Sequence, residues 1–152
     1  MKKYRIYLDN CCYHRPFDNQ EQRNIFDETM AKLYIQELVK YDCLALVYSY
    51  ISLDEIEANR AQMNKTSILK FIDENASIYV GAEYTDASIQ IANGIKKTGI
   101  KDFDALHIAC AIIAECDYFI TTDKRLLQYE TEKINIISPV DYIKIVEDED
   151  NV

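Results

Sequence analysis

The sequence predicts an α/β domain built on a parallel sheet. Short apolar runs rich in β-branched residues alternate along the chain with longer segments whose apolar residues recur at helical spacing. Strands that alternate with helices are joined by right-handed crossovers, so we expect helices on both faces of the sheet. The chain has 152 residues, 49% of them hydrophobic, with 3 glycines and 2 prolines, which is the size and composition of one globular domain.

Four apolar runs predict strands, and a weaker run predicts a fifth. The strands are expected at residues 5–8, 44–48, 118–122 and 134–138, with the weaker one at 77–80. Helical patterns lie at 20–39, 53–63, 67–74, 86–97 and 103–115, and short helices at 123–129 and after Pro139. The expected sheet therefore has about five strands.

Acidic residues outnumber basic ones, 26 against 17, which gives a net charge of −9. This balance argues against binding nucleic acid by bulk electrostatic attraction. Four acids at 147–150 predict a solvated acidic tail, 147–152, after a single domain of residues 1–146. Without those four charges the net charge is −5, so the placement of the remaining acids decides what the surface can bind.

Cysteine usage and hydropathy predict a reduced, non-membrane protein. Five cysteines are an odd number, and the opening residues contain no apolar run long enough for a secretory signal. We therefore expect free thiols and a cytoplasmic location. No apolar run approaches the ~18 residues of a membrane-spanning helix.

Four carboxylates lie where the strands end or the following helices begin. Asp9 and Asp123 follow predicted strands, while Glu55 and Asp104 lie near the starts of helices. Ligands of open parallel sheets bind beyond the carboxyl ends of the strands, so these acids can gather at one edge. Like charges in one pocket need a cation, and all-oxygen ligation suits Mg²⁺ or Mn²⁺. Such a site hydrolyses phosphodiester bonds.

Each acid also has a structural interpretation. Ser52-x-x-Glu55 fits a capping box, Asp9 fits an Asx turn, and Asp104 and Asp123 fit helix caps or first-turn acids. Taken singly, a structural role is the simpler explanation for each. Their joint placement favours a metal site, and the spacing leaves both interpretations open.

The chain resembles the PIN-domain ribonucleases, which include the toxins of VapBC-type toxin–antitoxin pairs. The resemblance covers most of the chain and rests on residues 6–9 (IYLD), 104–111 (DALHIACA) and 117–123 (DYFITTD), with Ser49, Glu55 and Asn59 between them. It implies a three-layer α/β/α fold with a five-stranded parallel sheet, and Mg²⁺- or Mn²⁺-dependent cleavage of single-stranded RNA. It also implies an acidic quartet of Asp9, Glu55, Asp104 and Asp123, with Thr121 as an accessory polar residue.

The same resemblance implies partners. VapC-like toxins bind an antitoxin protein and often form homodimers, so an antitoxin and a second copy of the chain are expected partners besides RNA. The sequence departs from the family at residues 10–19 (NCCYHRPFDN), where it predicts a polar loop after Asp9.

Several further residues have two interpretations. Lys101, Lys124 and Arg125 flank the acids and can hold substrate phosphates, or they are solvated helix ends. His107 can act as a general acid, although a hydrogen-bonded, half-buried histidine is the favoured interpretation. Three tyrosines can stack on bases or belong to the core: Tyr13, Tyr48 and Tyr50.

Two functions from different classes remain open at this point. The first is a metal-dependent endoribonuclease, and the alternative is a non-catalytic PIN-like module that binds RNA or protein. The complete quartet favours the nuclease, whereas the acidic composition favours the module.

Overall fold

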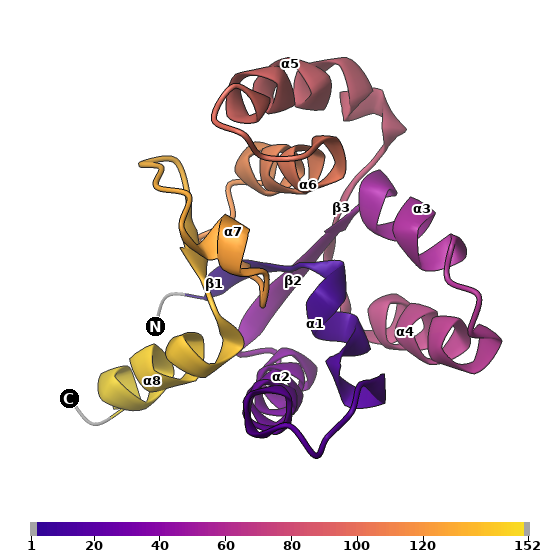
Figure 1. Cartoon of the computed structure of the whole chain (residues 1–152), viewed down its shortest axis with the longest axis vertical. Coiled ribbons are helices and arrows are strands. Elements are labelled where there is room, and N and C mark those ends of the chain that lie inside the picture. Colours follow the sequence, from indigo (N-terminus) through magenta and orange to yellow (C-terminus); the bar gives the residue numbers. More distant parts are fainter. Residues whose placement is uncertain (1–2, 151–152) are drawn as a thin grey trace.

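The computed structural model describes residues 3–150, which form three layers around one parallel sheet (Figure 1). The strands are β1 (Tyr4–Leu8), β2 (Leu44–Ser49), β3 (Ile78–Val80), β4 (Tyr118–Ile120) and β5 (Asn135–Ile137). Their order is β3-β2-β1-β4-β5, and every neighbouring pair is parallel. The predicted fold class is confirmed, and β1 at the centre is where the strand order reverses.

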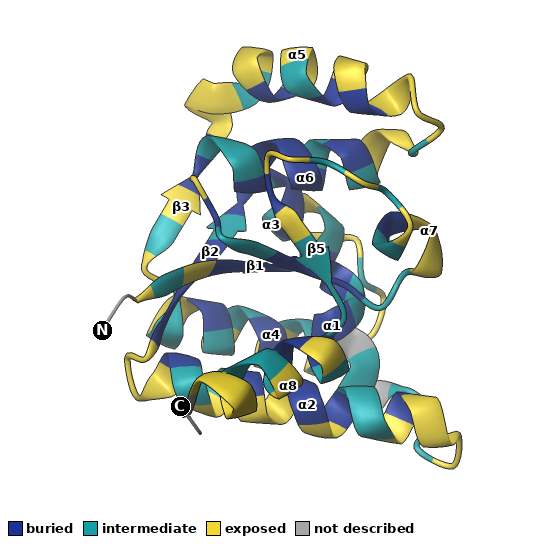
Figure 2. Ribbon diagram, turned by 90° about the vertical axis from the view of Figure 1, so that its left-hand side faces the viewer, coloured by how far each residue is buried: buried dark blue, intermediate teal, exposed yellow. Residues whose placement is uncertain are grey.

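Helices cover both faces of the sheet. Figure 2 shows α6 against one face with α5 packed outside it, and α2, α4 and α8 against the other face. The helices are α1 (Asn10–His14), α2 (Arg23–Lys40), α3 (Tyr50–Glu57), α4 (Gln62–Asn75), α5 (Thr85–Lys96), α6 (Asp102–Ile113), α7 (Lys124–Leu127) and α8 (Pro139–Asp150). Short 3-10 turns lie at Arg15–Phe17 and Ala82–Tyr84.

The two faces of β1 belong to two separate apolar cores. Tyr7 packs in the core that contains Ile108 of α6, whereas Ile6 and Leu8 pack in the core that contains Ile35 of α2. Successive side chains of a strand point to opposite faces, so a central strand covered on both sides must be apolar throughout. That is why residues 6–8, the buried part of β1, form an uninterrupted apolar run.

The polar loop predicted at residues 10–19 is wrong. The Asp9 carboxylate accepts the backbone N–H of Asn10 and caps α1, which runs directly into the 3-10 turn Arg15–Phe17. A five-residue helix is too short to show an apolar period, so the polar composition of the segment concealed it.

The single helix predicted at 53–63 is also wrong. α3 begins at Tyr50, where Ser49 and Ser52 form a capping box, and ends at Glu57. The chain then turns at Asn59, whose Oδ1 accepts the N–H of Ala61 at 2.9 Å, before α4 starts. Local side-chain hydrogen bonds of this type compete with helix continuation.

The predicted boundary at residue 146 falls inside a helix. α8 continues to Asp150, so the acidic run forms its last turn rather than an extended tail; residues 151–152 lie outside the described residues. The five cysteines are free thiols, as expected. Among residues 3–150, no helix is both long and apolar enough to cross a membrane.

Candidate functional site

The sheet positions polar residues at the carboxyl end of its two central strands. Asp9 follows β1 directly, and Thr121 follows its neighbour β4. Parallel strands end at the same edge, so these side chains meet although 112 positions separate them. The Thr121 hydroxyl donates to Asp9 Oδ2 at 2.8 Å and accepts the backbone N–H of Asp123 at 3.0 Å. Thr121 is fully buried and ties Asp9 to the segment that carries Asp123.

Asp9 is held on both of its oxygens. Oδ1 accepts the N–H of Asn10 at 2.8 Å, and Oδ2 accepts from Thr121 and contacts the Cys11 thiol at 3.5 Å. Its side chain is buried, so these donors offset the loss of water around the carboxylate. Asp9 is therefore the N-cap of α1, a role that the predicted Asx turn did not include, and its carboxylate stays at the edge of the sheet.

Glu55 is held by residues from two other elements. Oε2 accepts from the Asn10 side-chain amide at 2.7 Å, and Oε1 lies 2.8 Å from His107 Nε2. The capping-box interpretation of Glu55 is wrong, because Ser49 and Ser52 form that box. The Glu55 side chain instead extends from α3 to Asn10 of α1 and His107 of α6.

A buried hydrogen-bond relay, formed by His107, Tyr7, Ser49 and Ser52, supports Glu55. His107 is fully buried, and its Nδ1 lies 2.6 Å from the Tyr7 hydroxyl, which also contacts the hydroxyls of Ser49 and Ser52. A carboxylate only accepts, so His107 donates through Nε2 and, when neutral, accepts from Tyr7 through Nδ1. Burial raises the pKa of Tyr7 well above its usual value and keeps its proton on the hydroxyl. The hydrogen-bonded interpretation of His107 is confirmed, and its burial is complete.

Asp104 is the carboxylate with an altered acidity. No described residue donates a hydrogen bond to it, and partial burial together with the charges of Asp9, Asp123 and Glu55 raises its pKa to about 6, while His107 opposes this shift. The other three predicted acids therefore lie close enough to Asp104 to act on its charge.

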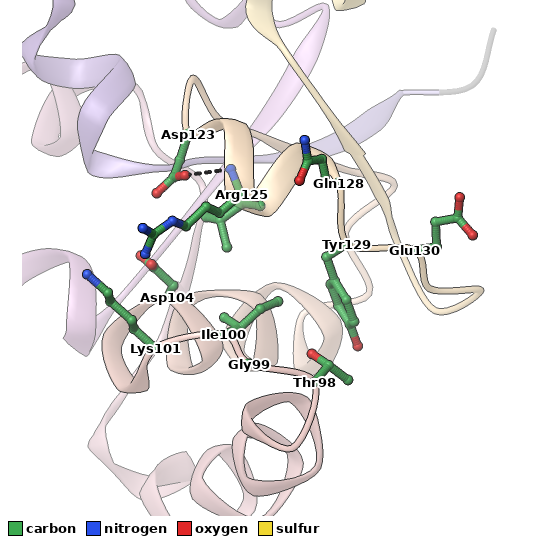
Figure 3. Close-up of a pocket in the computed structure, with 11 residues that line it drawn as sticks. Thr98, Gly99, Ile100, Lys101, Asp104, Asp123, Arg125, Gln128, Tyr129 and Glu130 are labelled. Carbon is green, nitrogen blue, oxygen red and sulfur yellow. Dashed lines mark hydrogen bonds between the residues drawn. The ribbon is translucent and has the colours of Figure 1, made fainter.

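A cavity of about 770 Å³ opens beside Asp104 and Asp123 (Figure 3). The two carboxylates turn toward the same side of the cavity, where the Lys101 and Arg125 side chains also lie. Asp123 Oδ1 accepts the backbone N–H of Arg125 at 2.9 Å and caps α7, so its cap interpretation is confirmed as well. The cavity thus combines acidic groups with two cations.

The metal-binding chemistry of these residues can be judged from their oxygens. Among residues 3–150, no group of three His, Cys, Asp or Glu side chains is arranged so that it could hold a metal ion. All four candidate ligands are nevertheless carboxylates, which are the donors that hard divalent cations prefer. A cation would also relieve the repulsion that raises the pKa of Asp104. The chemistry of these residues, though not their arrangement in this structure, therefore suits Mg²⁺ or Mn²⁺.

The comparisons with known proteins agree with this architecture. The chain matches no family model and no curated protein sequence. Its fold is similar to the crystal structure of VapBC2 from Rickettsia felis bound to a DNA fragment from their promoter, with a TM-score of 0.55. That match covers 88% of this chain and 98% of the other, at 16% sequence identity. The chain has a PIN-like fold.

Some predicted residues lie away from the cavity of this PIN-like domain. Lys124 is exposed and outside its lining. For the three tyrosines, the structure favours the core interpretation over base stacking. Tyr13 is buried, Tyr48 packs on the ring of Tyr79 at 4.7 Å, and Tyr50 hydrogen-bonds to Ser88.

The sequence interpretation also missed residues that the PIN-like domain uses to build the site. Asn10 is buried and holds Glu55, and its position beside Asp9 was a signal for this role. Tyr129 lines the cavity beyond Arg125, at the end away from the acids (Figure 3). Tyr7 contributes through its hydroxyl. In the sequence, Tyr7 cannot be told apart from any other core residue.

Proposed function

We propose that this PIN-like domain is a metal-dependent endoribonuclease that hydrolyses RNA phosphodiester bonds with Mg²⁺ or Mn²⁺ at Asp9, Glu55, Asp104 and Asp123. The observation that carries the proposal is the raised pKa of Asp104, which reflects burial together with the charges of the other three acids. A bound cation would remove the repulsion among these carboxylates.

Under this proposal the four acids have two different roles. Asp9 and Glu55 are oriented by hydrogen bonds from Thr121, Asn10 and His107, so their carboxylates can receive a cation without losing rotational freedom at that moment. Asp104 and Asp123 face the cavity. When bound, the cation would polarise the scissile phosphate and activate water for attack.

Lys101 and Arg125 provide the complementary charge for RNA. Both line the cavity beside the acids, at positions where they can pair with phosphates on either side of the scissile bond. Tyr129, farther along the same cavity, offers a ring on which an unpaired base can stack. This arrangement supports a single-stranded substrate, because paired bases do not expose their faces.

We further propose that an antitoxin protein restrains this nuclease. The support is the likeness in fold to VapBC2, which was crystallised on its promoter DNA. Under this proposal, expression of the chain alone arrests growth, and expression of the Asp104→Asn variant does not.

One observation favours the alternative, a non-catalytic module that binds RNA or protein. Among the described residues, no group of three His, Cys, Asp or Glu side chains is arranged so that it could hold a metal ion. The alternative predicts RNA binding that persists in EDTA without any cleavage.

Cleavage of a single-stranded RNA, with and without EDTA, separates the two functions. We expect cleavage with Mn²⁺ or Mg²⁺ that EDTA stops, and a loss of at least ~10²-fold in Asp9→Asn and Asp104→Asn. Asp102→Asn is the matched control, because Asp102 lies in the same first turn of α6 but is exposed and paired with Lys96 at 2.8 Å. Cleavage that survives in Asp104→Asn, or in EDTA, contradicts the proposal.

A further inference from the structure

A buried lysine lies on the opposite side of the sheet from His107. Lys32 is in the middle of α2 and only 4% exposed, yet no described acidic residue pairs with it. Its ammonium instead lies 5.8 Å from the ring centroids of both Tyr13 and Phe71. Lysines are almost never buried unless they are paired, so this position requires an explanation.

The lysine lines a cavity of about 340 Å³ between α1, α2 and α4. Figure 1 shows α1 and the 3-10 turn after it lying between α2 and α4. Tyr13 lines the same cavity, is 1% exposed, and its buried hydroxyl has no hydrogen-bond partner among the described residues. One cavity therefore collects a buried hydroxyl that has no described partner and a lysine that has no described acidic partner.

Burial of this ammonium is unfavourable as the structure stands. Desolvation lowers the pKa of Lys32 to about 8. The Cys12 thiol acts on Lys32 electrostatically, but its own pKa is raised well above the usual value by its contact with Cys11 and by burial, so it is neutral and supplies no counter-charge. The two aromatic rings compensate only in part, since each ring centroid lies 5.8 Å from the ammonium, near the outer limit of a cation–π contact. An anion in the cavity would satisfy the lysine and the tyrosine together.

The rest of the lining restricts what that anion can be. Leu33, Ile68 and Phe71 provide apolar surface, and the volume lies near the lower end of the ~300–1,000 Å³ typical of small-molecule sites. A bare inorganic anion would leave the apolar surface uncovered. A nucleotide would bring more negative charge than one ammonium can balance.

We propose that this cavity binds a small organic carboxylate, with the carboxylate on the Lys32 ammonium and the Tyr13 hydroxyl and the apolar body on Phe71, Leu33 and Ile68. The site is separate from the acidic cluster, and the proposal does not depend on nuclease activity. Tyr13 belongs to α1, the helix that Asp9 caps, so an occupant would lie at the far end of that helix.

The test uses the full-length chain with ¹³C-labelled lysine Cε, octanoate as the probe, and 1-octanol and inorganic phosphate as comparators. We expect octanoate to shift the Lys32 resonance saturably, and 1-octanol and phosphate to bind at least ~10-fold more weakly, since a charge-assisted hydrogen bond contributes about 1.5–3 kcal/mol. The Lys32→Met variant assigns the resonance and should lose at least ~10-fold in octanoate affinity by calorimetry. Tyr13→Phe should lose less.

Lys70→Met is the matched control, because Lys70 is on the exposed face of α4 and should not affect binding. Lys32→Met should fold, since methionine fills a similar volume without a charge, and its thermal midpoint should rise. The proposal is overturned if octanoate produces no saturable shift, if octanoate and 1-octanol bind equally well, or if Lys32→Met binds octanoate as tightly as the unchanged chain.

Discussion

The acidic cluster has two halves, Asp9 with Glu55 and Asp104 with Asp123, which differ in how many hydrogen bonds the protein donates to their carboxylates. Asp9 and Glu55 each accept hydrogen bonds on both oxygens from buried or half-buried donors. Asp104 has no such donor among the described residues, and Asp123 accepts one backbone N–H and faces the cavity. The protein itself therefore satisfies one half, whereas the other half has few protein donors among the described residues and borders the cavity. Mutations in the first half should change folding, and those in the second should change acidity and binding.

The relay behind Glu55 should show the largest effect on stability. His107→Ala removes a fully buried ring and leaves Glu55 and Tyr7 without their shared partner, which should lower the free energy of unfolding by about 3 kcal/mol. Urea unfolding measures this change. A loss under about 0.5 kcal/mol would mean that the relay does not hold Glu55 in solution.

Thr121 should show a smaller effect of the same kind. Thr121→Val keeps the shape but removes the hydroxyl that joins Asp9 to the Asp123 backbone, and should cost about 1–2 kcal/mol. Thr121→Ser keeps the hydroxyl and is the matched control. Equal stability of the two variants would show that the bridge is not formed.

In the half of the cluster formed by Asp104 and Asp123, a substitution should raise the stability of the protein instead of lowering it. Asp104→Asn should stabilise the metal-free protein by on the order of 1 kcal/mol at pH 7, after allowance for solvent screening. Because its pKa rises from 3.8 to about 6 on folding, the ionised carboxyl disfavours the folded state above about pH 6. That penalty fades as the pH falls from 6 toward 4.

Thermal unfolding of both proteins across this pH range measures the effect. The difference in melting temperature between Asp104→Asn and the unchanged chain should stay nearly constant from pH 7 to about pH 6 and then shrink as the pH falls toward 4. A difference independent of pH would show that Asp104 titrates as an ordinary surface acid.

The cavity cations should give the smallest effect. Lys101→Ala and Arg125→Ala should each weaken RNA binding by roughly 3–5-fold and make it less dependent on salt. Lys124→Ala, outside the cavity lining, should weaken it less, and fluorescence anisotropy at several salt concentrations separates the three. An equal loss in all three variants would place RNA outside the cavity.

The sequence predicted the layout of the sheet because its buried strands are uninterrupted apolar runs. It also predicted that Asp9 and Asp123 lie at the carboxyl ends of strands: Asp9 directly follows β1, and Asp123 follows β4 after Thr121 and Thr122. These positions depend on topology alone, which periodicity reveals.

Contacts between distant residues were beyond prediction. The Tyr7–His107 hydrogen bond joins residues 100 positions apart, and its existence depends on how α6 packs on β1. The break between α3 and α4 carries no glycine or proline and is made by the Asn59 side chain. Lys32 reads in the sequence as an ordinary polar residue of an amphipathic helix, and only packing against Tyr13 and Phe71 reveals its burial.

The central claim is that the four acids share one divalent cation, and calorimetric titration with Mn²⁺ tests it most directly. We expect the unchanged chain and Asp102→Asn to bind Mn²⁺ alike, and Asp104→Asn and Asp123→Asn to bind at least ~10-fold more weakly. If the unchanged chain does not bind Mn²⁺, or if Asp104→Asn and Asp123→Asn bind Mn²⁺ as tightly as the unchanged chain does, the four acids do not form a metal site.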